Sequence, residues 1–331
     1  DNHPVIATHS GPFHWDDALA CWQLTQLPEY AEAKVVRTRD QDVISAATIV
    51  VDVGGVYDHE ARRYDHHMKT CNETMPGYDI KLSSAGMVYK HYGHQIIDIL
   101  CAYMDTPVTL TETQREWVYQ TVYKGYVMAC DGQDTGEAKV VNADGTEDGL
   151  TVRYSDSTGM GSTIANLRPQ WNESFSFDSR FPEAMATAGA HFKAHVTRVV
   201  KHRLPAYDIV KTAMDNRRTT LPWGEGRVLV IDTGVPADRM VYEMEEEKGL
   251  VLYIVMPRSD GTWGVKAVNR EGSMALRKPL PSAWGGLRHQ DLDKATGLTG
   301  CVFVHKALFT GAASDRQTAL DMARMAYENM E

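Results

Sequence analysis

Histidines and aspartates gather in three short segments near the start of the chain, each at the end of a predicted strand. The first segment carries His9, His14 and Asp16, the second carries Asp52, and the third is Asp65-His66-His67. Any one of these residues alone is better explained as a helix cap or an ordinary surface or core side chain. Together, imidazoles and carboxylates suit divalent ions such as Mn²⁺, and without cations such crowded carboxylates would repel one another. The pattern therefore predicts a metal centre.

A pair of such ions would be suited to phosphoester hydrolysis, because two cations can stabilise both the attacking and the leaving oxygen. A fourth candidate segment, Asp131-Gly132-Gln133-Asp134, ends a predicted helical run. It offers two aspartates, and the residues themselves leave the choice between Asp131 and Asp134 open.

The elements that must position these side chains are strands and helices in alternation. Residues 5–8, 34–37 and 48–53 predict short strands, and residues 16–27 predict a helix after the first of them. This order is typical of βαβ units on a parallel sheet, in which ligand sites lie beyond the carboxyl ends of the strands. The acid and histidine clusters should therefore meet at one sheet edge.

The length of 331 residues favours two domains. Helical patterns dominate from residue 83 to 136, and a further helix over 181–204 leads into a region of strands separated by glycine turns. We predict an α/β fold in which residues 1–195 form a parallel sheet flanked by helices, and residues 196–331 form a smaller α+β domain.

Composition excludes several classes of protein. Hydrophobic residues make up 43% of the chain, yet no apolar run approaches the roughly 20 residues that a membrane helix needs. The net charge of −10 excludes a protein that coats nucleic acid non-specifically. The best local candidate for an RNA backbone track is 191–220, which is basic but is equally well read as a charged helix. Five scattered cysteines without a CxxC pair favour a reducing compartment.

Basic and hydroxyl side chains near the clusters predict a binding site for the substrate phosphate. Arg63 precedes the Asp-His-His triplet, and Lys81 stands before Ser83 and Ser84 at the start of a predicted helix. A helix N-terminus with nearby cations suits an anion. As structure alone, either serine is simply an N-cap, and the two interpretations have equal weight.

Several longer motifs resemble those of one family. They are Thr8-His9-Ser10-Gly11-x-Phe13-His14-x-Asp16-Asp17, Val51-Asp52-Val53-Gly54-Gly55, Arg63-Tyr64-Asp65-His66-His67, Lys81-Leu82-Ser83-Ser84-Ala85-Gly86, Trp284-x-Gly286-Leu287-Arg288 and Gly300-Cys301-Val302-Phe303-Val304-His305. The chain resembles the melanocyte-proliferating-gene (Myg) exonuclease family, part of the DHH phosphoesterase superfamily with the RecJ nucleases. The likeness covers nearly the whole chain.

The resemblance implies a DHH-type catalytic domain and a 3′→5′ exonuclease that acts on single-stranded RNA, releases nucleoside monophosphates and resides in mitochondria, the nucleus or both. It also implies two divalent ions, Mn²⁺ or alternatively Mg²⁺. Superfamily analogy assigns metal-ligand roles to His9, His14, Asp16, Asp52, His66 and Asp131. His67 would face the scissile phosphate, Asp65 would orient a histidine, and Arg288 would contact substrate.

Departures from the family pattern keep two alternatives open. Trp15 stands where the family commonly has Cys, and residues 306–313 replace a double-glycine loop that would approach substrate phosphates. The first alternative is a hydrolase of small phosphates, namely pyrophosphate, short oligonucleotides or cyclic dinucleotides. The second is a non-catalytic RNA-binding protein.

Overall fold

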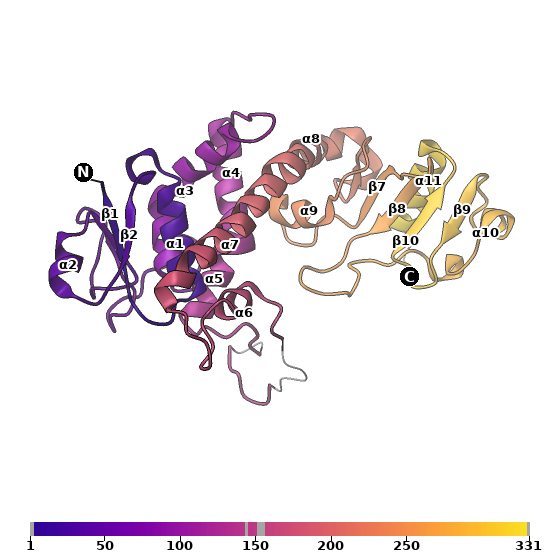
Figure 1. Cartoon of the computed structure of the whole chain (residues 1–331). Coiled ribbons are helices and arrows are strands. Elements are labelled where there is room, and N and C mark those ends of the chain that lie inside the picture. The colour runs from indigo at the N-terminus through magenta and orange to yellow at the C-terminus, as the bar shows by residue number, and fades with distance from the viewer. Residues whose placement is uncertain (1–2, 143–144, 151–155, 330–331) are drawn as a thin grey trace. The chain divides into compact units, whose positions relative to one another are not determined.

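The computed structural model describes residues 3–142, 145–150 and 156–329. The chain forms two compact units, Asp1–His202 and Arg203–Glu331 (Figure 1). Both combine a five-stranded mixed sheet with helices, so the predicted two-domain α/β fold is confirmed.

The first unit is built on a sheet with the strand order β2-β1-β3-β5-β4. The strands are β1 (Val5–Thr8), β2 (Lys34–Arg37), β3 (Ile49–Val51), β4 (Tyr57–Asp58) and β5 (Arg63–Tyr64). The β2-β1, β1-β3 and β3-β5 pairs are parallel, whereas β4 pairs antiparallel with β5 at the edge. The expected parallel sheet is thus present and carries one antiparallel edge strand.

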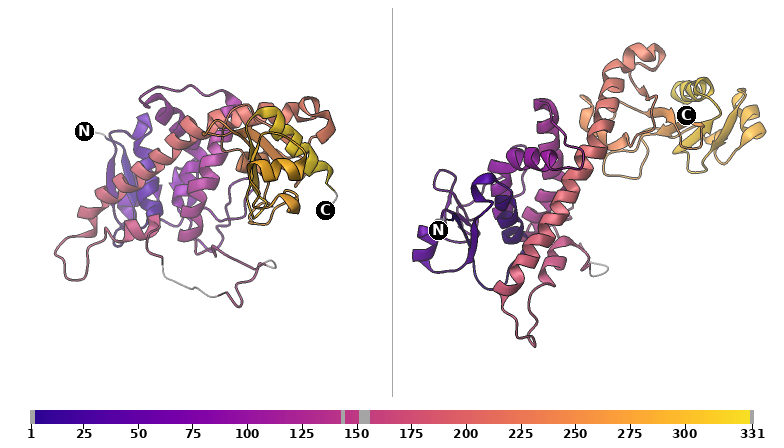
Figure 2. Two further views of the ribbon diagram at one scale, coloured as in Figure 1. Left: turned by 90° about the vertical axis from the view of Figure 1, so that its right-hand side faces the viewer. Right: turned by 45° about the horizontal axis from the view of Figure 1, so that its top comes forward.

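Helices pack around this sheet and around one another. They are α1 (Trp15–Thr25), α2 (Gln41–Ala46), α3 (Ser84–Ala102), α4 (Glu112–Val122), α5 (Met128–Asp134), α6 (Met160–Ala165) and α7 (Phe177–Arg198), with 3-10 turn Pro28–Tyr30 and π-turns Tyr123–Val127 and Val199–Arg203. Helix α7 lies along α1 (Figure 2). The contact is close: a β-carbon at Gly189 of α7 would fall 2.1 Å from the indole nitrogen of Trp22 in α1.

A capping residue sets the N-terminus of α1 and of α3. Helix α1 begins after His14, whose backbone N–H donates a 2.8 Å hydrogen bond to Asp17. Helix α3 begins after Ser83, whose side chain accepts from Gly86 N–H. Such caps satisfy backbone donors that have no partner within the helix, and so they set where each helix begins.

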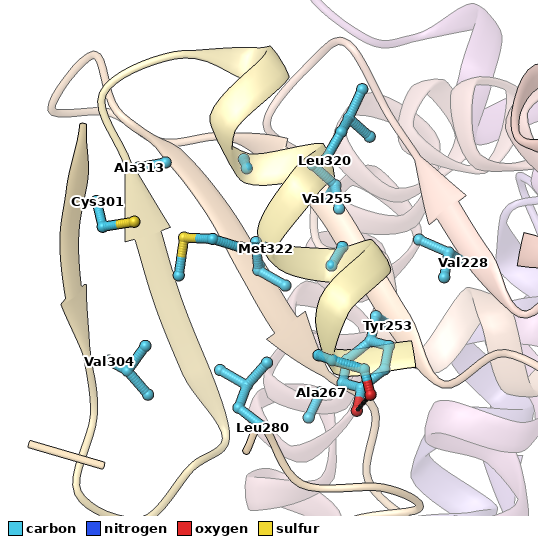
Figure 3. Close-up of a cluster of buried hydrophobic side chains, with 14 of the residues drawn as sticks. Val228, Tyr253, Val255, Ala267, Leu280, Cys301, Val304, Ala313, Leu320 and Met322 are labelled. Carbon is cyan, nitrogen blue, oxygen red and sulfur yellow. Dashed lines mark hydrogen bonds between the residues drawn. The ribbon is translucent and has the colours of Figure 1, made fainter. Parts of the chain in front are cut away.

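The second unit has the strand order β6-β7-β8-β10-β9. Its strands are β6 (Val228–Val230), β7 (Tyr253–Pro257), β8 (Trp263–Ala267), β9 (Cys301–Val304) and β10 (Thr310–Ala313), and its helices are α8 (Leu204–Thr220), α9 (Asp238–Met244), α10 (His289–Thr296) and α11 (Arg316–Glu328), with 3-10 turns Pro222–Gly224 and Ser282–Trp284. One buried cluster joins α11 to the sheet, including Leu320 and Met322 (Figure 3). A second cluster joins α8 and α9 to strand residues such as Leu229 and Ile254.

No helix within the described residues combines the length and the apolar character needed to cross a membrane. All five cysteines are free thiols, and four of them are buried.

Candidate metal centre

The carboxyl ends of β1, β3 and β5 bring the three predicted clusters together. His9 follows β1, Asp52 follows β3, and Asp65-His66-His67 follows β5. Because these neighbouring strands are parallel, all three clusters meet at the same edge. Asp52 has a φ of 57°, in the left-handed region that few residues other than glycine adopt. Its backbone N–H donates to Tyr64 O, so the strand pairing holds this conformation.

Asp52 lies between two histidines. Its Oδ2 is 3.3 Å from Nε2 of His9, and its Oδ1 is 3.2 Å from Nε2 of His66. The histidines each have a second carboxylate neighbour: Asp17 Oδ2 is 3.2 Å from His9, and Asp134 Oδ2 is 3.0 Å from His66. A single carboxylate therefore connects two histidine–aspartate pairs.

Three groups of side chains have ligand atoms that all lie within 4.8 Å of one another. These groups are His9, His14 and Asp52; Asp52, His66 and His67; and His14, Asp16 and Asp134. Asp16 independently fits a metal-ligand role, because both of its carboxylate oxygens are buried without a hydrogen-bond partner. The donor set fits divalent ions that accept nitrogen and oxygen ligands.

The charges in this centre are poorly balanced without a cation. Burial, together with the Asp52 and Asp134 carboxylates, raises the pKa of Asp16 well above its usual range. Burial on its own would lower the pKa of His66, but the Asp134 and Asp52 carboxylates outweigh it and raise that pKa to about 10. Metal ligands must be deprotonated, so metal binding here would release protons.

Asp65 holds His67 at the rim of the centre. Oδ1 of Asp65 is 2.7 Å from Nδ1 of His67, and its Oδ2 accepts a 2.6 Å hydrogen bond from Gly55 N–H. Asp65 is buried, whereas the His67 side chain is 61% exposed. The arrangement fixes one ring nitrogen of His67 and leaves the imidazole accessible to a ligand.

Asp131 is placed differently from the prediction. Its Oδ1 accepts hydrogen bonds from the backbone N–H and the hydroxyl of Ser83, at 3.0 and 2.7 Å. The carboxylate is therefore committed to the start of α3 and lies outside the three ligand groups, which contain Asp134 instead. Asp134 thus lies nearer the other candidate ligands than Asp131 does, and the metal-ligand role of either residue stays a prediction.

The predicted substrate-binding residues do not form one cluster. Ser83 and Ser84 are buried, and the hydroxyl of Ser84 donates to Asp52 Oδ1 at 3.3 Å. The hydroxyls of both serines therefore contact carboxylates, and their predicted contact with substrate stays a prediction. The Arg63 guanidinium donates to backbone carbonyls, including Ala47 O, and its contact with substrate likewise stays a prediction.

The other two predicted substrate-binding residues, Lys81 and Arg288, are exposed. Lys81 precedes α3 in the first unit and pairs with Thr74 in an isolated β-bridge. Arg288 belongs to the second unit, where its guanidinium lies 5.8 Å from the Phe303 ring centroid. Neither is among the ligand groups, and their predicted contact with substrate stays a prediction.

Sequence reasoning missed two members of the centre. Asp17 belongs to the first motif, but its position is typical of an acidic residue in the first turn of a helix. It also has that structural role in α1. Arg39 follows β2 and lines a cavity of about 400 Å³ together with His9, His14, Asp52 and His67. Its position just after a predicted strand was the available signal.

Comparison with known proteins finds one family over nearly the whole chain. Residues 5–327 match the model described as "Uncharacterised protein family (UPF0160)", which carries the MYG1 exonuclease label. A MYG1 protein of Dictyostelium discoideum is 36% identical over 96% of this chain and 95% of its own length. The MYG1 exonuclease of Homo sapiens is 34% identical over 97% of this chain and 85% of its own length.

Proposed function

This chain belongs to the MYG1 family, and from that premise we propose that it is a metal-dependent phosphodiesterase that trims single-stranded RNA from the 3′ end and releases nucleoside monophosphates. The mouse and human relatives are named exonucleases, which supports hydrolysis of a nucleic acid. The RNA preference, the polarity and the place in the DHH superfamily rest on the motif resemblance.

The observation that carries the proposal is the position of Asp52 between His9 and His66. We assign the ligands of two divalent ions, Mn²⁺ or Mg²⁺, to six side chains. They are His9, His14, Asp16, Asp52, His66 and Asp134. When bound, such ions supply positive charge to a phosphoryl group and make water more acidic.

The rim pair Asp65–His67 supports the same chemistry. The hydrogen bond that His67 donates to Asp65 raises the pKa of His67 above its ordinary value, although burial opposes it. A protonated His67 donates to a phosphoryl oxygen and stabilises the negative charge that develops there. If His67 binds metal, the hydrogen bond orients the ring as a ligand. In the reaction, a water oxygen bonds to phosphorus, the bond to the leaving 3′ oxygen breaks, and that oxygen gains a proton.

A 5′-labelled single-stranded RNA tests activity and polarity in one assay. With Mn²⁺, digestion from the 3′ end should give a ladder of progressively shorter labelled products. Digestion from the 5′ end would instead release a labelled mononucleotide at once. EDTA should stop the reaction, and Asp52→Asn should slow it by about 100-fold or more. Asp79→Asn, at an exposed site outside the ligand groups, is the matched control.

The same assay separates the alternatives. Faster turnover of pyrophosphate, a cyclic dinucleotide or a short oligonucleotide than of long RNA would favour a hydrolase of small phosphates. RNA binding without product under any divalent ion would favour a non-catalytic RNA-binding protein. The proposed compartment, mitochondrion or nucleus, is tested separately by fractionating cells that express the tagged protein.

A further inference from the structure

Two cavities adjoin the metal centre and share one side chain. The first, of about 400 Å³, is the cavity lined by Arg39. The second, of about 360 Å³, is lined by Trp15, Gln133, Asp134 and Arg168, and His14 borders both cavities. We call them the Arg39 cavity and the Arg168 cavity. Both lie within the first unit, and each contains residues of the ligand groups.

Each cavity contains an arginine without a carboxylate partner. Arg39 contacts Ser10 O at 3.3 Å and Nδ1 of His9 at 3.5 Å. Arg168 donates from Nε to Phe13 O at 2.6 Å. Within the described residues, no carboxylate oxygen lies within 4.0 Å of either guanidinium, whereas Arg37 and Arg115 of the same unit are ion-paired. An unpaired guanidinium has donors free for a ligand, and its plane can stack on the ring of a base.

The size and lining of the cavities favour one nucleoside in each. Both volumes fall at the small end of the roughly 300–1,000 Å³ found for ligand pockets. The Arg168 cavity also offers the Gln133 amide, which can donate to and accept from a base edge, and the Trp15 ring. A phosphodiester cleaved at the shared border would have one neighbouring nucleoside on either side.

We propose that the Arg39 and Arg168 cavities receive the two nucleosides that flank the scissile phosphodiester, with Arg39 and Arg168 as positioning residues. This inference rests on the proposed function and names the parts of the substrate that the site recognises. It makes a dinucleotide the shortest substrate that fills the site.

Three substrates that differ in their number of nucleosides test the inference. They are a dinucleotide, a nucleoside 5′-(p-nitrophenyl phosphate) and bis(p-nitrophenyl) phosphate, assayed with Mn²⁺. We expect Arg39→Met and Arg168→Met each to lower kcat/KM for the dinucleotide by about 10- to 100-fold, mainly through KM. The ester with one nucleoside should be strongly sensitive to one variant only. Bis(p-nitrophenyl) phosphate should lose far less with either.

Arg180→Met, which removes a partly buried arginine on α7 that lines neither cavity, is the control and should leave all three rates unchanged. Thermal unfolding of each variant identifies a loss of folding. Equal losses on all three substrates would overturn the inference, because the arginines would then act on the reacting phosphoryl group. Unchanged rates would overturn it and leave the proposed function standing. A wild-type protein inactive on every substrate would overturn both.

Discussion

The Asp16 carboxylate lies 4.0 Å from Nε2 of His66, and both of its oxygens are buried without a hydrogen-bond partner. Such a group is costly to ionise in the absence of a cation. The buried position of Asp16 suits a metal ligand, and it should make Asp16 destabilising in the metal-free protein.

Replacing Asp16 with Asn should therefore stabilise the metal-free protein. In EDTA at pH 8, we expect the free energy of unfolding to rise by about 1–2 kcal/mol, because Asn removes the cost of burying an unpartnered carboxyl group. The stabilisation that Mn²⁺ gives the wild type should shrink in the variant. Thermal melts with and without Mn²⁺ measure both effects. The Asp79→Asn control should show neither, and an Asp16→Asn protein less stable in EDTA would contradict the expectation.

Asn substitutions at Asp131 and at Asp134 should have different effects on stability and on Mn²⁺ affinity. Asp131→Asn should cost about 1–3 kcal/mol of stability, because the amide reproduces only part of the acceptor that holds Ser83. Asp134→Asn should reduce Mn²⁺ affinity by about 10-fold or more with little loss of stability. Calorimetric metal titration and urea unfolding of both variants measure the difference. The reverse pattern would restore Asp131 as the ligand.

The α1–α7 contact should not tolerate a methyl group at Gly189. Gly189→Ala should cost about 1–3 kcal/mol, because its β-carbon would fall 2.1 Å from Trp22 Nε1. Gly132→Ala in α5 is the matched control, since its β-carbon would meet neighbours at 3.7 Å or more and alanine favours helix. Urea unfolding should show a loss for the first variant alone, and equal stabilities would refute the packing argument.

A stack of two histidines should make stability depend on pH. The rings of His59 and His91 lie 3.8 Å apart, and burial, with the nearby charges of His59 and Lys90, lowers the pKa of His91 to about 4 against the raising effect of Glu73. The unfolded chain, with the ordinary value of 6.5, binds more protons in this window. Stability should therefore fall as the pH drops from about 6.5 to about 4.

Equilibrium unfolding across this pH range, in the wild type and in His91→Gln, measures the effect. We expect a loss of about 1–2 kcal/mol in the wild type, because the half-buried ring stays partly hydrated. The loss should largely disappear in His91→Gln and persist in a control with exposed His3 changed to Gln. Identical slopes for wild type and His91→Gln would show that another group titrates.

The sequence by itself determined the alternation of strand and helix and the place of His9, Asp52 and His66 after strands. Since parallel neighbours end at one edge, the convergence of these residues followed from topology alone. Only the tertiary structure decided which aspartate of α5 joins them. Asp131 and Asp134 are one helical turn apart, and the packing of α5 against α3 gives the first to Ser83 and brings the second to His66. The same packing buries Ser83 and Ser84, because contacts between elements distant in sequence set burial.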